Sequence, residues 1–170
     1  VHARFVIPKF PKKNFHNFKK YAVGCLLDMG PYAAAVFRIF ISKNIKKVTF
    51  LSSFKENQNG VNENFDVKIV VGKKSFSGYF SHNGEYENTL TLFTKKKSVT
   101  INRVFSPPND IDLTLRINAG NTNKEKKLKS DDTFFNYFNK IITLLRAKEF
   151  ESSYQNLLKD SFFRKKLCSK

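Results

Sequence analysis

The feature that most constrains the fold is a series of short alternating segments, joined by tight connections, between residues 46 and 117. β-branched and aromatic residues recur at every second position, the pattern of a strand with one buried face. The connections hold glycine, asparagine or lysine and are so short that neighbouring strands must run antiparallel. We therefore predict a largely antiparallel open sheet of about six strands. The predicted strands lie at about 46–54, 64–71, 75–82, 88–94, 98–104 and 111–117.

The residues before this region combine extended, irregular and helical patterns. Residues 3–7 are typical of a short strand that ends before a proline, and residues 8–22 have no sustained period and are predicted to be an irregular loop anchored by phenylalanine rings. Apolar residues at helical spacing predict a helix over 25–41. The Gly30-Pro31 pair inside it predicts a kink or a restart.

The residues after the strands predict a loop and two helices. Residues 119–130 are rich in glycine, asparagine and lysine and are predicted to be a loop. Ser130-Asp131-Asp132 is a capping sequence for a helix with one apolar face, and a final helix covers about 151–167. These elements predict an α+β fold with helices packed on one face of the sheet, and a single domain spanning residues 1–170.

Composition and cysteine usage exclude several classes of protein. Hydrophobic residues make up 41% of the chain, which excludes general disorder. No stretch reaches the roughly 18 apolar residues of a membrane span. Cys25 and Cys168 are far apart and form no CxxC motif, so we expect neither a metal site nor a disulfide framework. This cysteine usage is compatible with a reducing compartment, and we expect a cytoplasmic location. Because the sequence opens at Val1 without an initiator methionine, we expect it to be a piece of a longer polypeptide.

The charge distribution indicates an anionic partner. The formal net charge is +17, and the first 55 residues contain 11 Lys or Arg but a single carboxylate, Asp28. This part of the chain should attract anions. Asp28 lies in an apolar run, where an ionised side chain is costly unless it has a partner.

Asp28 and Tyr32 are four residues apart, which places both side chains on one face of the predicted helix. A phenol can donate a proton to a carbonyl or alkoxide oxygen. The alternative is structural: Tyr32 is a core aromatic and Asp28 a cap or an ion-pair partner. The histidines, His2, His16 and His82, are scattered, and we interpret them as incidental rather than as metal ligands.

Residues 24–32, Gly-Cys-Leu-Leu-Asp-Met-Gly-Pro-Tyr, resemble the motif that opens the C-terminal domain of the glucose-fructose oxidoreductase/inositol dehydrogenase (Gfo/Idh/MocA) family. The family pattern is Gly-Gly-Gly-x-Leu-x-Asp-x-Gly-x-His, with Tyr in place of His in the sugar-nucleotide ketoreductase branch. Residues 85–90 and 103–108 also resemble that branch, in the same order. The resemblance implies an oxidoreductase that acts on a sugar or nucleotide-sugar.

The resemblance covers only the second half of such enzymes. In the family, an N-terminal Rossmann domain binds NAD or NADP and supplies a catalytic lysine, and neither is present in this sequence. The implied role is therefore substrate binding and homo-oligomerisation through the sheet, with this fragment inactive alone. We expect neither nucleic acid nor membrane as a partner.

The resemblance also assigns residues to roles. Tyr32 is implied to be the proton donor to the sugar oxygen, and Asp28 to position the sugar or the tyrosine. Asn14 and Phe15 match the family's Asn-Phe-Arg loop near the substrate, with His16 at the arginine position, and Lys12 is assigned to the same substrate-binding set. Gly24 and Gly30 are assigned to the approach of the cofactor, while Ala22 and Val23 replace two of the family's glycines.

Two other functions remain open on the sequence alone. The net charge and the aromatic content would suit a basic module that binds single-stranded nucleic acid through exposed Phe and Tyr on its sheet. The departures at His16, Ala22 and Val23 would suit a non-catalytic dimerisation scaffold derived from the enzyme.

Overall fold

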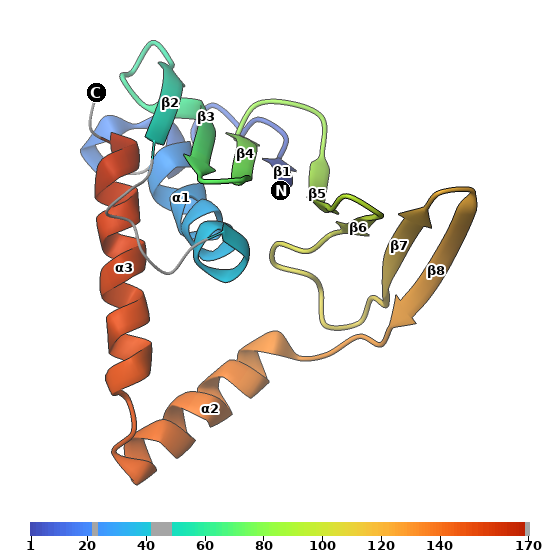
Figure 1. Ribbon diagram of the computed structural model, residues 1–170. Coiled ribbons are helices and arrows are strands. Elements are labelled where there is room, and N and C mark those ends of the chain that lie inside the picture. Colours follow the sequence, from blue (N-terminus) through green and yellow to red (C-terminus); the bar gives the residue numbers. More distant parts are fainter. Residues whose placement is uncertain (22–23, 42–48, 169–170) are drawn as a thin grey trace.

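The computed structural model describes residues 1–21, 24–41 and 49–168, which form one mixed sheet with three α-helices (Figure 1). The general α+β class is confirmed, but the sheet has eight strands in the described residues rather than about six. The strands are β1 (His2–Val6), β2 (Thr49–Glu56), β3 (Asn62–Val71), β4 (Lys74–Ser81), β5 (Glu87–Phe93), β6 (Ser98–Asn102), β7 (Leu113–Ala119) and β8 (Thr122–Leu128). The α-helices are α1 (Cys25–Val36), α2 (Thr133–Ala147) and α3 (Glu151–Cys168).

The strand order is β2-β3-β4-β1-β5-β6-β7-β8, so the first strand of the chain lies in the middle of the sheet. β1 pairs parallel with β4 and antiparallel with β5, while the other neighbours are antiparallel hairpins. The prediction of a largely antiparallel sheet did not include this parallel pair. The first part of the strand predicted at 46–54 lies outside the described residues.

β8 corrects the prediction of a loop over 119–130. Its residues are almost all exposed, and β7 and β8 meet at a tight turn in which Gly120 has a φ of 57°. Arg116 and Glu125 form a cross-strand ion pair at 3.0 Å. An alternating apolar pattern is absent because neither face of β8 is buried, and this is why the sequence pattern missed the strand.

The hydrophobic core lies between one face of the sheet and helices α1 and α3 (Figure 1). Phe65 and Phe80 on neighbouring strands are fully buried and stack with ring centroids 4.8 Å apart. Phe37 and Phe163 join the two helices, with ring centroids at 5.1 Å. This face of the sheet therefore sets where α1, the predicted site helix, lies.

α1 is continuous through Pro31, so the predicted restart at Gly30-Pro31 does not occur. A proline inside a helix leaves the carbonyl four residues earlier without its usual donor. Here that carbonyl belongs to Leu27, and it accepts a hydrogen bond from the Arg164 side chain of α3 at 3.4 Å. The irregular segment comes later, as a π-helical turn at Phe37–Ile41.

α2 departs from the prediction that the helices pack on the sheet. Asp132 caps it as predicted, since its side chain accepts a hydrogen bond from the backbone N–H of Phe135 at 2.8 Å. None of the helix's residues is buried, and Figure 1 shows it apart from the sheet. The apolar face that the sequence predicted is therefore exposed, with Phe134, Phe138 and Leu145 each more than half accessible.

Across the described helices, none combines the length and apolar character needed to cross a membrane.

Candidate functional site

Tyr32 lies on α1 with its ring anchored and its hydroxyl at the surface. The ring packs edge-on against Phe5, with centroids 5.3 Å apart, and beside Phe105 at 5.4 Å. The hydroxyl forms an exposed hydrogen bond with the Oγ of Ser106 at 2.5 Å. The Tyr32 ring therefore packs on the core, as the structural alternative expects, while its hydroxyl oxygen reaches the surface.

The turn that carries Ser106 is held by a buried asparagine. Asn88 on β5 donates from Nδ2 to the carbonyl of Phe105 at 2.6 Å, and its Oδ1 accepts from the Phe105 N–H at 3.0 Å. Ser106 itself has a φ of 48°, a left-handed conformation that is uncommon for a residue with a side chain. The three stretches that carry the family resemblance, at 24–32, 85–90 and 103–108, meet at this point.

Replacing Asn88 by alanine tests this arrangement. The substitution leaves the buried N–H and C=O of Phe105 without partners, and we expect it to lower the free energy of unfolding by about 2 kcal/mol or more. Urea denaturation of Asn88→Ala measures this, with Asn102→Ala on the exposed end of β6 as the matched control. Equal losses in the two variants would contradict a clamping role.

Asp28 lies on the same helix as Tyr32 but has different partners. Its side chain is 32% exposed, and its Oδ2 contacts the Nε2 of His16 at 3.3 Å and the Nε2 of His82 at 3.6 Å. Among the described residues, no hydrogen bond joins Asp28 to Tyr32. Asp28 thus has the partners that the charge argument required, and they are histidines.

His16 is held in place by the loop before α1. Its backbone N–H and its ring Nδ1 both contact the Oδ1 of Asn14, at 3.0 and 2.7 Å. The ring stacks on Phe10, with centroids 4.1 Å apart. The loop predicted over 8–22 is therefore more ordered than expected and contains two 3-10 turns, Phe15–Asn17 and Lys19–Tyr21.

His82 is the residue that sequence reasoning treated as incidental. It directly follows β4, is 6% exposed, and burial lowers the pKa of its imidazole, with the nearby His16 lowering the pKa further and Asp28 opposing both. Burial also favours the neutral form of Cys25: it raises the pKa of the thiol, and the negative charge of Asp28 raises it further. His82 and Cys25 are therefore neutral groups beside the carboxylate at neutral pH.

The remaining predicted residues lie around this centre. The exposed Phe15 ring is 4.0 Å from the His16 ring, and Lys12 lines a surface groove between the loop and the β2–β3 turn. A side chain at Gly24 would approach the backbone of Asn62 to 3.3 Å, and one at Gly30 would face Arg164 at 3.8 Å. Both glycines therefore lie against neighbouring protein elements, and their assignment to cofactor approach stays a prediction.

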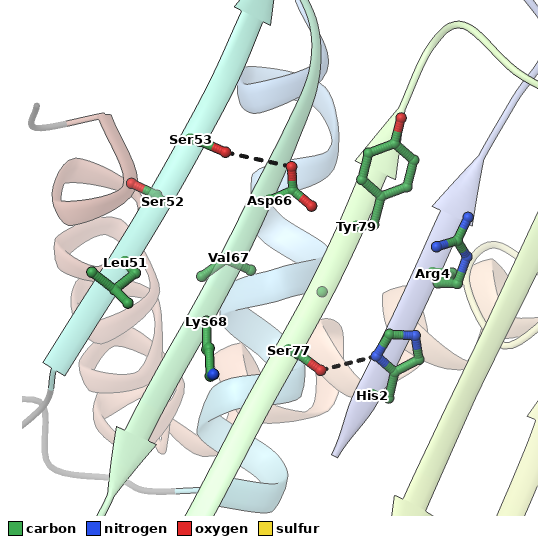
Figure 2. Close-up of a pocket in the computed structure, with 11 residues that line it drawn as sticks. His2, Arg4, Leu51, Ser52, Ser53, Asp66, Val67, Lys68, Ser77 and Tyr79 are labelled. Carbon is green, nitrogen blue, oxygen red and sulfur yellow. Dashed lines mark hydrogen bonds between the residues drawn. The ribbon is translucent and has the colours of Figure 1, made fainter.

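A second groove lies on the opposite face of the sheet, away from the helices (Figure 2). It has a volume of about 560 Å³ and is lined by β1 to β4, with His2 hydrogen-bonded to Ser77 at 2.9 Å. Neither Asp28 nor Tyr32 lines it. In the part of the chain that the structure describes, no group of three His, Cys, Asp or Glu is placed to hold a metal ion.

Comparisons with known proteins give a likeness of fold without a match of sequence. No protein-family model and no curated protein sequence matches the chain. A solved structure of KijD10, a 3-ketoreductase from Actinomadura kijaniata in complex with NADP and TDP-benzene, superposes with a TM-score of 0.84 at 20% identity. The alignment covers 95% of this chain and 50% of the KijD10 chain.

Two further solved structures are similar. UDP-N-acetylglucosamine 3-dehydrogenase GnnA from Acidithiobacillus ferrooxidans has a TM-score of 0.62 at 7% identity, covering 86% of this chain and 44% of its own. The putative oxidoreductase yvaA from Bacillus subtilis has a TM-score of 0.61 at 13% identity, covering 94% and 53%. The chain thus spans about half the length of these proteins. The resemblance to the glucose-fructose oxidoreductase/inositol dehydrogenase family is confirmed as a likeness of fold: the described residues fold like half of the 3-ketoreductase KijD10.

Proposed function

We propose that this chain is the substrate-binding half of an NAD(P)-dependent oxidoreductase that acts on a nucleotide-sugar. The observation that carries the proposal is the surface-facing Tyr32 hydroxyl, paired with Ser106 where the three resembling stretches meet. The similar solved structures support the substrate class, because KijD10 was solved with TDP-benzene and GnnA is described as a UDP-N-acetylglucosamine dehydrogenase.

The chemistry proposed for this chain is proton transfer at the sugar oxygen. Phenols remain protonated at neutral pH, so Tyr32 can donate a proton to the carbonyl oxygen when a keto-sugar is reduced. The Ser106 hydroxyl then returns a proton from solvent to the tyrosine oxygen, and oxidation runs the same transfers backwards. The nicotinamide cofactor supplies or takes up the hydride.

The two glycines that the resemblance assigns to the approach of that cofactor lie against other parts of this chain. A side chain at Gly24 would meet the backbone of Asn62 at 3.3 Å, and one at Gly30 would be in ordinary contact with Arg164 at 3.8 Å. We therefore assign the binding of NAD or NADP mainly to a Rossmann domain outside residues 1–170.

The substrate is proposed to lie along the loop before α1. His16 contacts Asp28 from this loop, with Asn14 and Phe15 against the His16 ring, and Lys12 contributes positive charge two residues before Asn14. A nucleoside diphosphate carries negative charge that such a loop attracts. In this arrangement Asp28 lies between the loop and Tyr32 on the helix and is positioned to accept a hydrogen bond from a sugar hydroxyl.

A turnover assay tests the proposed function. The complete polypeptide that carries residues 1–170 is incubated with NAD or NADP and a panel of nucleoside-diphosphate sugars, and cofactor reduction is followed by absorbance. We expect NAD or NADP to be reduced at a rate that depends on both the sugar and the nucleoside diphosphate of the substrate. Tight sugar-nucleotide binding with no reduction would instead favour the non-catalytic scaffold.

The open face of the sheet is proposed to form the homo-oligomer contact. Leu51 is 62% exposed on this face, on the edge strand β2, where it lines the groove drawn in Figure 2. Leu51→Asp introduces a charge that would have to be desolvated in such a contact, so we expect it to shift the protein to monomers. Light scattering after size-exclusion chromatography measures the mass. Ser152→Asp, at an exposed position of α3 and away from this face of the sheet, should leave the mass unchanged, and an unaltered oligomer in Leu51→Asp would contradict the assignment.

A further inference from the structure

His16, Asp28 and His82 come from three separate segments and converge on one carboxylate oxygen. His16 lies in the loop before α1, Asp28 in the first turn of α1, and His82 directly after β4. Both imidazoles direct Nε2 at the Oδ2 of Asp28, while among the described residues no hydrogen bond reaches its Oδ1. We call these three residues the His–Asp–His cluster.

The hydrogen bonds fix where the protons of His16 lie. The side-chain oxygen of Asn14 accepts the backbone N–H of His16 at 3.0 Å, which identifies this atom as an acceptor. The ring Nδ1 of His16, 2.7 Å from the same oxygen, must therefore carry a proton. Its Nε2 faces a carboxylate oxygen at 3.3 Å, a favourable contact only if this nitrogen carries a proton as well.

His82 differs from His16 because it is buried. Its side chain is 7% exposed, against 20% for His16, and burial lowers the pKa of the His82 imidazole. A neutral His82 makes a favourable contact with Asp28 when its proton is on Nε2. At 3.6 Å this contact is electrostatic rather than a short hydrogen bond.

We propose that His16 is a pH-dependent cation of the substrate site, held as an imidazolium between Asn14 and Asp28, with His82 as the positioning residue that fixes the carboxylate. The role of His16 in substrate binding rests on the proposed function, whereas its charge state rests only on its contacts with Asn14 and Asp28. Besides its own three members, the charged or titratable groups near the cluster include the buried, neutral Cys25 thiol and Glu63, whose backbone carbonyl accepts a hydrogen bond from the His82 N–H and whose carboxylate pairs with Lys9.

A histidine at position 16 behaves differently with pH from an arginine at that position. Guanidinium stays charged at all working pH values, whereas imidazole loses its charge within the physiological range. Without a proton on Nε2, the His16 imidazole would turn a lone pair toward the Asp28 carboxylate, and the site would lose a positive charge. Binding of an anionic ligand should therefore weaken with rising pH in this chain.

Nuclear magnetic resonance of the ¹⁵N-labelled histidines tests the charge state directly. In the wild-type protein at pH 6, we expect both His16 nitrogens to show the imidazolium pattern. Asp28→Asn removes the partner charge and should lower the ratio of charged to neutral His16 at pH 7 at least threefold, whereas His2→Gln on β1 should not change it. A neutral, singly protonated His16 at pH 6, or an unchanged ratio in Asp28→Asn, would overturn the proposal.

The positioning role of His82 has its own readout. His82→Gln retains an N–H that can reach the carboxylate, whereas His82→Ala does not. We expect the His16 ratio to fall in His82→Ala and to be largely restored in His82→Gln, with both proteins folded by circular dichroism. Equal ratios in the two variants, with both folded, would overturn the role of His82.

Calorimetric titration with TDP then separates this inference from the proposed function. We expect the Kd of the wild-type complete polypeptide to rise at least threefold from pH 6 to pH 8, although the charge of TDP increases over that range. His16→Arg should abolish the rise, and His16→Gln should bind weakly at both pH values. A wild-type profile equal to that of His16→Arg would overturn the inference. If TDP does not bind at either pH while His16 shows the imidazolium pattern, the nucleotide-sugar function fails and the cluster's charge state stands.

Discussion

Replacing Tyr32 by phenylalanine is expected to lower the turnover number of the complete enzyme by about 100- to 10,000-fold, the usual contribution of a positioned proton donor. The ring contacts with Phe5 and Phe105 remain, so α1 and the rings around position 32 stay in place. Only the hydroxyl paired with Ser106 is lost. The KM for the nucleotide-sugar should therefore change little, and steady-state kinetics measures both parameters.

Two further variants make this result specific to Tyr32. Ser106→Ala removes the partner of the phenol but keeps the donor, so we expect a smaller loss of turnover than in Tyr32→Phe. Tyr79→Phe, on the opposite face of the sheet, is the matched control and should retain full turnover. Unchanged turnover in Tyr32→Phe would remove the catalytic role of the phenol.

Replacing Phe80 by alanine is expected to lower the free energy of unfolding by about 3–5 kcal/mol, the usual cost of deleting a buried phenylalanine ring. Phe80 is fully buried, stacks on Phe65 at 4.8 Å and lies 6.1 Å from Phe105 by ring centroids. β4, which carries Phe80, is paired with β3 and β1 on its two sides, so its backbone cannot move far into the cavity that the alanine would leave. Denaturation by urea or heat measures the loss.

Phe93→Ala is the control for this experiment, because Phe93 is 64% exposed on β5 of the same sheet and its loss should cost less than about 1 kcal/mol. Phe80 also contacts Phe105, one of the two rings that hold Tyr32. We therefore expect Phe80→Ala to reduce turnover as well as stability. A loss of stability in Phe80→Ala no larger than in Phe93→Ala would contradict the position of the core between the sheet and α1.

The hairpins and the ends of the later helices could be predicted from the sequence because they depend on local signals. The turn at 72–73 and the cap at Asp132 are encoded by the residues that form them. The central position of β1 could not be predicted, since no local signal states which distant strands it pairs with. β8 and the exposed position of α2 were not predicted, for a related reason: the patterns used for prediction assume that a strand has a buried apolar face and that the apolar face of a helix is buried.

The candidate site was predicted in part. Asp28 and Tyr32 stand out in the sequence because the only carboxylate of a basic region lies one helical turn from a tyrosine. Their partners do not, because His82 and Ser106 lie 54 and 74 residues away from them, on turns positioned by the sheet. The three resembling stretches are far apart in the sequence, and the same sheet brings them together in space.

The most direct measurement is a crystal structure of the complete polypeptide with NADP and a nucleotide-sugar bound. The account predicts that the Tyr32 oxygen lies about 2.6–3.2 Å from the sugar oxygen that gains or loses the proton, with the Ser106 contact retained. A sugar bound beyond reach of Tyr32, with another group within that distance of the reacting oxygen, would contradict it.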